Sequence, residues 1–268
     1  MLAEVRPSDA PAAIAALYAD ILLVSGVPVV NLIWRHLATL PGVLAWAWSA
    51  VRPLVASSEM AEARVEISER TQASLAELRL GRAKLVRLNG GDPKPVRAII
   101  NGYLFGNLTN ITALTALRLR IRNQAAPSSR LTPAEQTAPV PMLPPLPSVR
   151  SLDPEIAAIV ESLASQHEAS AKGIVPSLYL ALTPWPDLLA ALAMALGPLY
   201  EPRQLHATRA LIVHHSSVQA TRMLPELGNP PMGYEAMLPV LSLFVDSVIP
   251  ELIAVCIGLR TLLARVVP

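Results

Sequence analysis

Cysteine is almost missing from this chain of 268 residues, in which Cys256 is the single example. One cysteine excludes an internal disulfide, a CxxC redox pair and any zinc site built from several cysteines. Aromatic residues make up only 4% of the chain. Leucine, alanine, valine and isoleucine must therefore fill the core. We expect a protein of a reducing compartment, and the cytoplasm is the expected location.

Charge is scarce as well: 22 Lys and Arg residues oppose 20 Asp and Glu residues, which leaves a net charge of +2. So small an excess predicts no nucleic-acid partner. Hydrophobic residues reach 52% of the chain, which excludes disorder over its length. The longest stretch without formal charge, 98–117, could span a bilayer, but it holds three asparagines. We therefore expect a buried helix there and no membrane partner.

Several motifs that are typical of enzymes are missing too. The sequence contains no GxSxG nucleophile elbow, no GxxxxGK[ST] phosphate loop, no GxGxxG and no HExxH. His214 and His215 are adjacent, so on a helix their rings point to different sides, whereas a metal pair needs a spacing of three or four residues. We expect no metal and no cofactor.

The chain repeats itself at an offset that stays near 140–145 residues. The matching segments are 6–14 with 150–159, 26–34 with 173–179, 36–44 with 181–189, and 104–107 with 243–246. Chance matches would not keep one offset. The repeat predicts two copies of one helical unit, residues 1–123 and 150–268, forming a pseudodimer around a pseudo-twofold axis. Between them, 124–149 holds seven prolines, which favour an extended linker along the surface.

Helix signals occur in both copies, and no segment shows sustained alternation of period two, so the predicted class is all-α. Asp153 is an N-cap followed by proline and glutamate. Residues 90–93, Gly-Gly-Asp-Pro, again place an aspartate N-cap before a proline, and predict the start of a long helix that runs to about Arg122. Residues 60–80 form an amphipathic pattern, and Pro239 and Pro250 should kink or break the last helical stretch.

Two polar features interrupt the apolar background. Tyr103, Asn107 and Asn110 lie at i, i+4 and i+7, on one face of the long helix. Buried amides need partners, so this face meets another polar surface or a wet pocket. From spacing alone, an asparagine pair that joins two helices is favoured over catalysis.

The second feature is Pro-Ser177-Leu178-Tyr179, whose counterpart in the first copy runs from Asn31 to Trp34. Each lies at the expected start of a helix, where free backbone N–H groups could hold a carboxylate. The alternative is simple N-capping by Ser177 or Asn31.

A longer pattern contains these residues. It consists of Val-Pro-x-x-Asn-Leu-Ile-Trp34-Arg-His-Leu-Ala-Thr-Leu-Pro-Gly, Phe-Gly-Asn107, and a second Pro-Ser-x-Tyr…Trp-Pro element. The pattern resembles the group I 2-haloacid dehalogenases, over nearly the whole chain. A more distant similarity is to the alkylhydroperoxidase D-like helical proteins, whose peroxidase branch needs a CxxC that this chain lacks. The first resemblance implies a helical pseudodimer of two repeats joined by a long linker.

The dehalogenase resemblance also implies a reaction, in which water attacks C2 of a small 2-haloalkanoic acid directly. Such a reaction needs a carboxylate base, an amide that aims the water, donors for the substrate carboxylate and an apolar halide pocket. The family's water-positioning asparagine falls on Asn107, and the serine before its catalytic aspartate falls on Ser177. With this correspondence, we expect Asn107 and Tyr179 to line one cavity between the halves, with Trp34, Asn31 and Asn110 nearby.

The catalytic aspartate of the family falls on Leu178, which cannot accept a proton. A family tyrosine is likewise replaced by Asn110, and an aromatic residue by Val29. Candidate substitutes for the base are Asp187, Glu168 and above all Asp246, the repeat counterpart of Asn107, which could pair with Asn31 at a second site. The alternative, an aspartate that packs helices together or is exposed, is favoured for Asp246.

Two hypotheses follow. One is a hydrolase for small 2-haloacids with weak activity or a relocated base. The other is a catalytically silent pseudodimer that binds a small carboxylic acid or an apolar ligand, or serves as an interaction scaffold. A homodimer is a further expectation.

Overall fold

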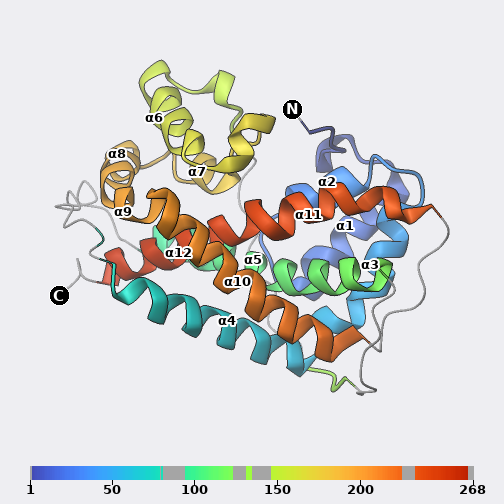
Figure 1. Ribbon diagram of the computed structural model, residues 1–268. Helices are drawn as coiled ribbons and strands as arrows, with labels where there is room; N and C mark the ends of the chain where they lie inside the picture. Colours follow the sequence, from blue (N-terminus) through green and yellow to red (C-terminus); the bar gives the residue numbers. More distant parts are fainter. Residues whose placement is uncertain are drawn as a thin grey trace.

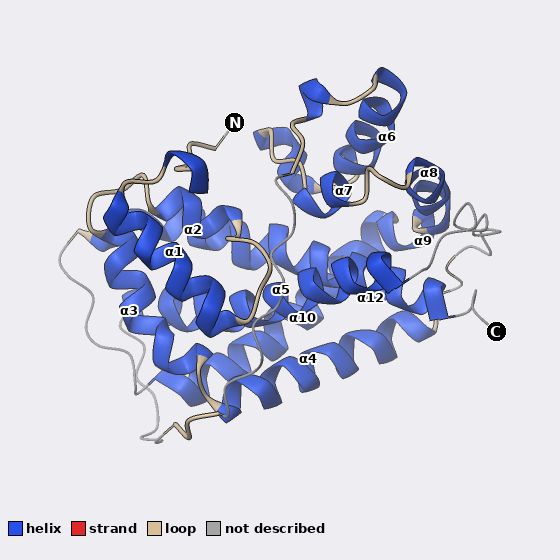
Figure 2. Cartoon of the chain, turned by 180° about the vertical axis from the view of Figure 1, so that it is seen from behind, coloured by secondary structure: helices blue, strands red, loops and turns tan. Residues whose placement is uncertain are grey.

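The computed structural model describes residues 2–78, 80, 94–122, 131–134, 146–224 and 233–264. All regular elements in this part are helices (Figure 2), and the only β-type pairing in it is an isolated bridge between Ser57 and Pro133. The all-α prediction is confirmed. Residues 90–93 and most of the predicted linker lie outside the described residues.

Each half begins with one helix, continues through a short one and reaches long helices later. The first half holds α1 (Ala12–Ser25), α2 (Leu32–Leu37), α3 (Val43–Val55), α4 (Ser58–Ala76) and α5 (Lys94–Ile121). The second half holds α6 (Pro154–Ser165), the 3₁₀ turn η3 (Glu168–Lys172), α7 (Ser177–Ala181), α8 (Pro186–Ala195), α9 (Gly197–Tyr200), α10 (Pro202–Met223), α11 (Leu238–Leu243), the π-helical turn η6 (Phe244–Val248) and α12 (Ile249–Ala264). This order agrees with a repeat, while a superposition of the halves remains a prediction.

The long helices α4, α5, α10 and α12 pack against one another in the middle of the molecule, with α1–α3 toward one end and α6–α9 toward the other (Figure 1). In α5, 20 of the 28 residues are buried, and in α12, 13 of the 16 are buried, as expected for helices that are surrounded by other elements over most of their length. In contrast, α4 buries a single stripe, made of Met60, Ala63, Ile67, Thr71 and Leu75. The core therefore centres on α5 and α12.

One helical run, Tyr234–Ala264, is long and apolar enough to cross a membrane by length and composition. Most of its apolar window, 78%, is buried inside the protein. A core helix of a globular protein has the same properties. Pro239 lies in the first turn of α11 and Pro250 near the start of α12, so the predicted interruption of this run is present as a π-helical turn.

Side-chain caps fix the starts of α6 and α4. The carboxylate of Asp153 accepts a 2.9 Å hydrogen bond from the backbone N–H of Glu155 at the start of α6, as predicted. Ser57 accepts one of 3.2 Å from Met60 at the start of α4. The described part of the linker lies against this same corner, where the N–H of Ser58 donates to the carbonyl of Thr132 at 2.9 Å.

The loop between α1 and α2 lies directly on α5 because α5 has glycines where the loop crosses it. A Cβ atom at Gly106 would lie 3.0 Å from Val27 Cγ1, and one at Gly102 would lie 3.3 Å from Pro28 Cγ. Small residues at these positions let the two backbones approach closely. This approach brings the start of α2 to the polar face of α5.

Candidate functional site

Helix α2 is joined to the polar face of α5 by one long-range hydrogen bond. The indole Nε1–H of Trp34 donates to Oδ1 of Asn110 at 3.0 Å, and both residues are buried. Asn31 lies one turn nearer the start of α5, with its Oδ1 about 3.8 Å from the Cβ position of Gly106. The structure thus brings Trp34, Asn31 and Asn110 together. Asn110 joins two helices through Trp34, but the expected asparagine pair is not formed, because the Nδ2 of Asn107 has no partner among the described residues.

Asn107 and Tyr103 lie on the same face of α5 and are buried, with 2% and 5% of their surface exposed. Among the described residues, neither the Nδ2 of Asn107 nor the hydroxyl of Tyr103 has a hydrogen-bond partner. Burial raises the pKa of Tyr103 to about 12, against smaller opposite effects of Ser177 and Arg35. Tyr103 therefore keeps its proton at neutral pH and, like Asn107, offers a free donor.

A third buried donor comes from Arg35 on α2, a residue that the sequence analysis missed. Its Nη1 pairs with Oε2 of Glu4 at 2.7 Å, while its buried Nε has no partner among the described residues. Arg6 also lies within 3.5 Å of Glu4. Arg6 is 61% exposed, so what Arg35 offers the site is its unpartnered Nε–H donor, while its charge is paired with Glu4. The only feature of the sequence that pointed to Arg35 was its position directly after Trp34.

Helix α7 covers the polar face of α5 from the second half. Ser177, its first residue, faces the Tyr103 hydroxyl and lowers its pKa, although the two groups do not meet with hydrogen-bond geometry. Neither Ser177 nor Asn31 caps its helix through its side chain, so the N-capping alternative is wrong. Both helices are too short, at five and six residues, for a strong terminal dipole.

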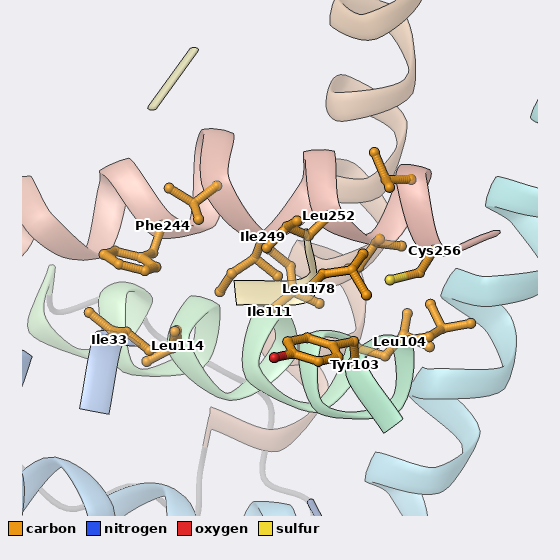
Figure 3. Packing of buried hydrophobic residues seen from close by; sticks show 14 of the residues in the cluster. Ile33, Tyr103, Leu104, Ile111, Leu114, Leu178, Phe244, Ile249, Leu252 and Cys256 are labelled. Atoms are coloured by element: carbon orange, nitrogen blue, oxygen red, sulfur yellow. The ribbon is translucent and has the colours of Figure 1, made fainter. Parts of the chain in front are cut away.

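Leu178 occupies the position that the dehalogenase resemblance gives to a catalytic aspartate. Its side chain is fully buried. Figure 3 shows it between α5 and α12, among Ile111, Ile249 and Leu252, with Tyr103 directly below. This environment suits a leucine and would strongly disfavour an ionised carboxylate.

Tyr179 points away from this group of residues. Successive helix residues are turned by about 100°, so Tyr179 leaves α7 on a different side from Ser177. Its hydroxyl lies 2.7 Å from Nε2 of His167 and 2.8 Å from the hydroxyl of Tyr200. The expectation that it meets Asn107 in one cavity therefore receives no support from its contacts.

Asp246 is paired with a residue other than Asn107, farther along α5. Its carboxylate accepts a 2.6 Å hydrogen bond from Nη1 of Arg118, which lies eleven residues after Asn107, or about 16 Å farther along α5. Asn31 lies at Gly106, so the expected pair of Asp246 and Asn31 is not formed. The other two candidate bases are also held elsewhere. Glu168 pairs with Arg209, and Asp187 is exposed in the first turn of α8.

Two surface hollows lie away from this site. One, of about 630 Å³, is lined by Leu78, Pro198, Glu201, Pro202, Arg203 and Gln204. The other, of about 350 Å³, is lined by Arg97, Ile100, Asn101, Arg260, Leu263 and Ala264. Neither is lined by the polar face of α5. Within the described residues, no cluster of three or more His, Cys, Asp or Glu side chains could hold a metal ion.

The site therefore lies where α2, α5 and α7 meet, and we call it the α2–α5–α7 site. Three of its residues, Arg35, Tyr103 and Asn107, each carry a buried donor without a partner among the described residues, and Tyr103 lies beside the apolar side chain of Leu178. Donors without acceptors suit an anion with several lone pairs, such as a carboxylate.

Comparisons with known proteins agree with this architecture. No protein-family model matches the sequence, and no curated protein matches it. Among solved structures, the fold is similar to that of a D-2-haloacid dehalogenase in complex with L-LA, with a TM-score of 0.80 at 17% identity, over 98% of this chain and 96% of that one. A mutant of D-2-haloacid dehalogenase in complex with D-2-CPA gives a TM-score of 0.77 at 18% identity, over 100% and 96%. A further mutant structure gives 0.78 at 18% identity, over 97% and 95%. Along its whole length, this chain has the fold of the D-2-haloacid dehalogenase structures.

Proposed function

We propose that this protein binds a small carboxylic acid of the 2-haloacid type at the α2–α5–α7 site, and that it releases halide very slowly or not at all. The observation that carries the proposal is the set of buried donors without partners on Arg35, Tyr103 and Asn107. A buried donor without a partner costs about 1–3 kcal/mol. A bound carboxylate would supply the acceptors, including one for the Nε–H of the charged Arg35 guanidinium, whose Nη1 is held by Glu4.

The second part of the proposal rests on Leu178. Hydrolysis by direct attack of water needs a group that removes the water's proton, and such assistance contributes about 10²–10⁴-fold. Leu178 has no such group and is packed in the core. The carboxylates of Asp246 and Glu168 are engaged by Arg118 and Arg209, and Asp187 is exposed. Asn107 could still orient a water molecule, but without a nearby base this water would react slowly.

The solved neighbours support the choice of ligand, because two of them are complexes of a D-2-haloacid dehalogenase with D-2-CPA or L-LA. We therefore propose small 2-substituted acids as the ligand class, with the apolar side chains around Leu178 next to the substituent at C2. We further propose that the protein is catalytically silent, cytoplasmic and homodimeric.

The test combines binding with turnover. Calorimetric titration of the wild-type protein with each enantiomer of 2-chloropropionate, and with propionate, should show binding of one or more of these acids. Tyr103→Phe should weaken the binding about 3- to 10-fold, because it removes one hydrogen bond to the ligand. Tyr234→Phe is the control, since this hydroxyl lies outside the site.

Halide release should be at or near the background rate for both enantiomers. Absence of binding of all three acids, or equal binding by Tyr103→Phe, would contradict the proposed site. Rapid halide release by the wild-type protein would contradict the role given to Leu178.

A further inference from the structure

Helix α7 connects the proposed ligand site to a second group of buried polar residues. Three successive residues of α7 enter three environments: Ser177 faces Tyr103, Leu178 enters the core, and Tyr179 reaches His167 and Tyr200. A helix of five residues has little stability of its own. Its position must therefore depend on the contacts that its side chains make.

The contacts of Tyr179 begin a continuous buried chain of hydrogen bonds. Tyr179 meets Nε2 of His167 at 2.7 Å, and Nδ1 of His167 donates to Oε2 of Glu251 at 2.9 Å. The exposed fractions of Tyr179, His167 and Glu251 are 0%, 3% and 0%. On the other side, Tyr200 meets the Tyr179 hydroxyl at 2.8 Å. Both polar edges of the His167 ring are thus satisfied.

The carboxylate of Glu251 is itself held by two further donors. Nη1 of Arg209 lies 3.2 Å from Oε1 of Glu251, and the hydroxyl of Ser247 lies 3.3 Å from the same atom. Arg209 and Ser247 also both contact Glu168, whose side chain is 62% exposed. The chain of hydrogen bonds therefore runs from the surface at Glu168 to the fully buried Tyr179, and ends at the half-buried Tyr200.

A gain in stability does not explain why these polar groups are buried together. Polar networks in a low-dielectric interior stabilise only when every member has a partner, and apolar residues of similar volume often stabilise as well or better. What such a network provides is a fixed geometry. Here it fixes the hydroxyl of Tyr179, two residues after the group that faces the ligand site.

We propose that His167 and Tyr179 are positioning residues of the ligand site, and that they act by holding α7 so that Ser177 faces Tyr103. This inference rests on the proposed function, because the affinity that it explains is that of the α2–α5–α7 site. Ser177 would serve as a further donor to the bound carboxylate. Its contribution would depend on hydrogen bonds made on another side of α7.

The experiment compares three variants of the full chain by two readouts. Tyr179→Phe removes the hydroxyl. His167→Asn keeps a donor near the position of Nδ1, toward Glu251, but loses the contact with Tyr179. His167→Gln carries an amide near the position of Nε2 and can still reach Tyr179. Ile212→Val is the control, because it removes one methyl group from a fully buried site on α10 and lowers stability without touching α7.

The first readout is the dissociation constant for 2-chloropropionate. Tyr179→Phe and His167→Asn should raise it about tenfold, whereas His167→Gln should restore most of the affinity and Ile212→Val should leave it unchanged. Equal affinities in all variants would overturn the positioning role.

The second readout needs no ligand. Amide hydrogen exchange of residues 177–181 should become about tenfold faster in Tyr179→Phe and His167→Asn than in Ile212→Val. Unchanged protection would overturn the inference even if the wild-type protein bound none of the acids. Faster exchange of residues 177–181 in these two variants, without binding of any acid by the wild-type protein, would support the inference that His167 and Tyr179 hold α7 in place. It would contradict only the proposed function.

Discussion

The indole N–H of Trp34 donates a 3.0 Å hydrogen bond to the side-chain oxygen of Asn110, which follows it by 76 residues in the chain. This bond attaches α2 to the face of α5 that also carries Tyr103 and Asn107. Asn107 on α5 and Arg35 on α2 each have a side-chain donor, Nδ2 and Nε, without a partner among the described residues. One paired asparagine thus helps to hold the unpaired one in place.

Breaking this bond should lower stability in a way that a double-mutant cycle can separate. Asn110→Leu leaves the buried indole N–H without an acceptor and should lower the free energy of unfolding by about 1–3 kcal/mol. Trp34→Phe in the Asn110→Leu background removes the unpaired donor. The double variant should therefore lose less free energy of unfolding than the two single variants lose in sum. Urea unfolding of the four proteins gives the coupling energy, and strict additivity would mean that the bond contributes nothing.

Much of the fold follows from local sequence signals. The cap at Asp153, the extent of α5 and the interruption near Pro239 and Pro250 are all present. These features depend on residues that are neighbours in the chain, so their physical causes can be identified in the sequence. The polar face of Tyr103, Asn107 and Asn110 was predictable for the same reason.

The site could be predicted only in part, because its other half depends on contacts between distant residues. His167 and Glu251 are 84 residues apart, and neither belongs to a recognisable motif. Tyr179 was assigned to the site because it follows Leu178, but a five-residue helix turns it toward His167. Asp246 was assigned through the repeat, whereas its actual partner is Arg118, 128 residues earlier in the chain.

Replacing Leu178 by aspartate tests the reason for the proposed inactivity. Leu178→Asp places a carboxylate in a fully buried apolar position, so we expect a loss of stability of about 2–5 kcal/mol. If Asn107 still orients a water molecule, halide release should rise above the wild-type rate by up to about 10²–10⁴-fold. Leu178→Asn is the matched control, similar in size but without a base. Equal rates for a folded Leu178→Asp and for Leu178→Asn would indicate a pocket adapted to another ligand.

Asp246 should be important for stability and not for binding. Asp246→Asn leaves Arg118, whose side chain is only 8% exposed, without its carboxylate, and we expect a loss of about 1–3 kcal/mol in the free energy of unfolding. Adding Arg118→Met should recover part of this loss, because the unpaired charge is removed. The affinity for 2-chloropropionate should stay the same in Asp246→Asn. A variant with normal stability and lost binding would instead assign Asp246 to the ligand site.

Cys256 should react with thiol reagents only when the protein opens. Its side chain is fully buried, and burial raises its pKa to about 12. At pH 8 only about one thiol in ten thousand is therefore ionised, and the thiolate is the reactive form. Labelling with a disulfide reagent should be slow in buffer and fast in urea, with a rate that follows unfolding. Labelling in buffer at the rate of a free thiol would show that this part of α12 is accessible.

The most direct test of the ligand site is the effect of Asn107→Leu on binding and stability, measured in one series with Asn101→Leu. Asn101 is exposed on the same helix and serves as the control. The site predicts that Asn107→Leu abolishes the binding of 2-chloropropionate, yet raises the free energy of unfolding by about 1–3 kcal/mol, because the buried amide without a partner is gone. Asn101→Leu should change neither quantity by a comparable amount. Lower stability of Asn107→Leu together with unchanged binding would contradict the account, because Asn107 would then be an ordinary structural residue.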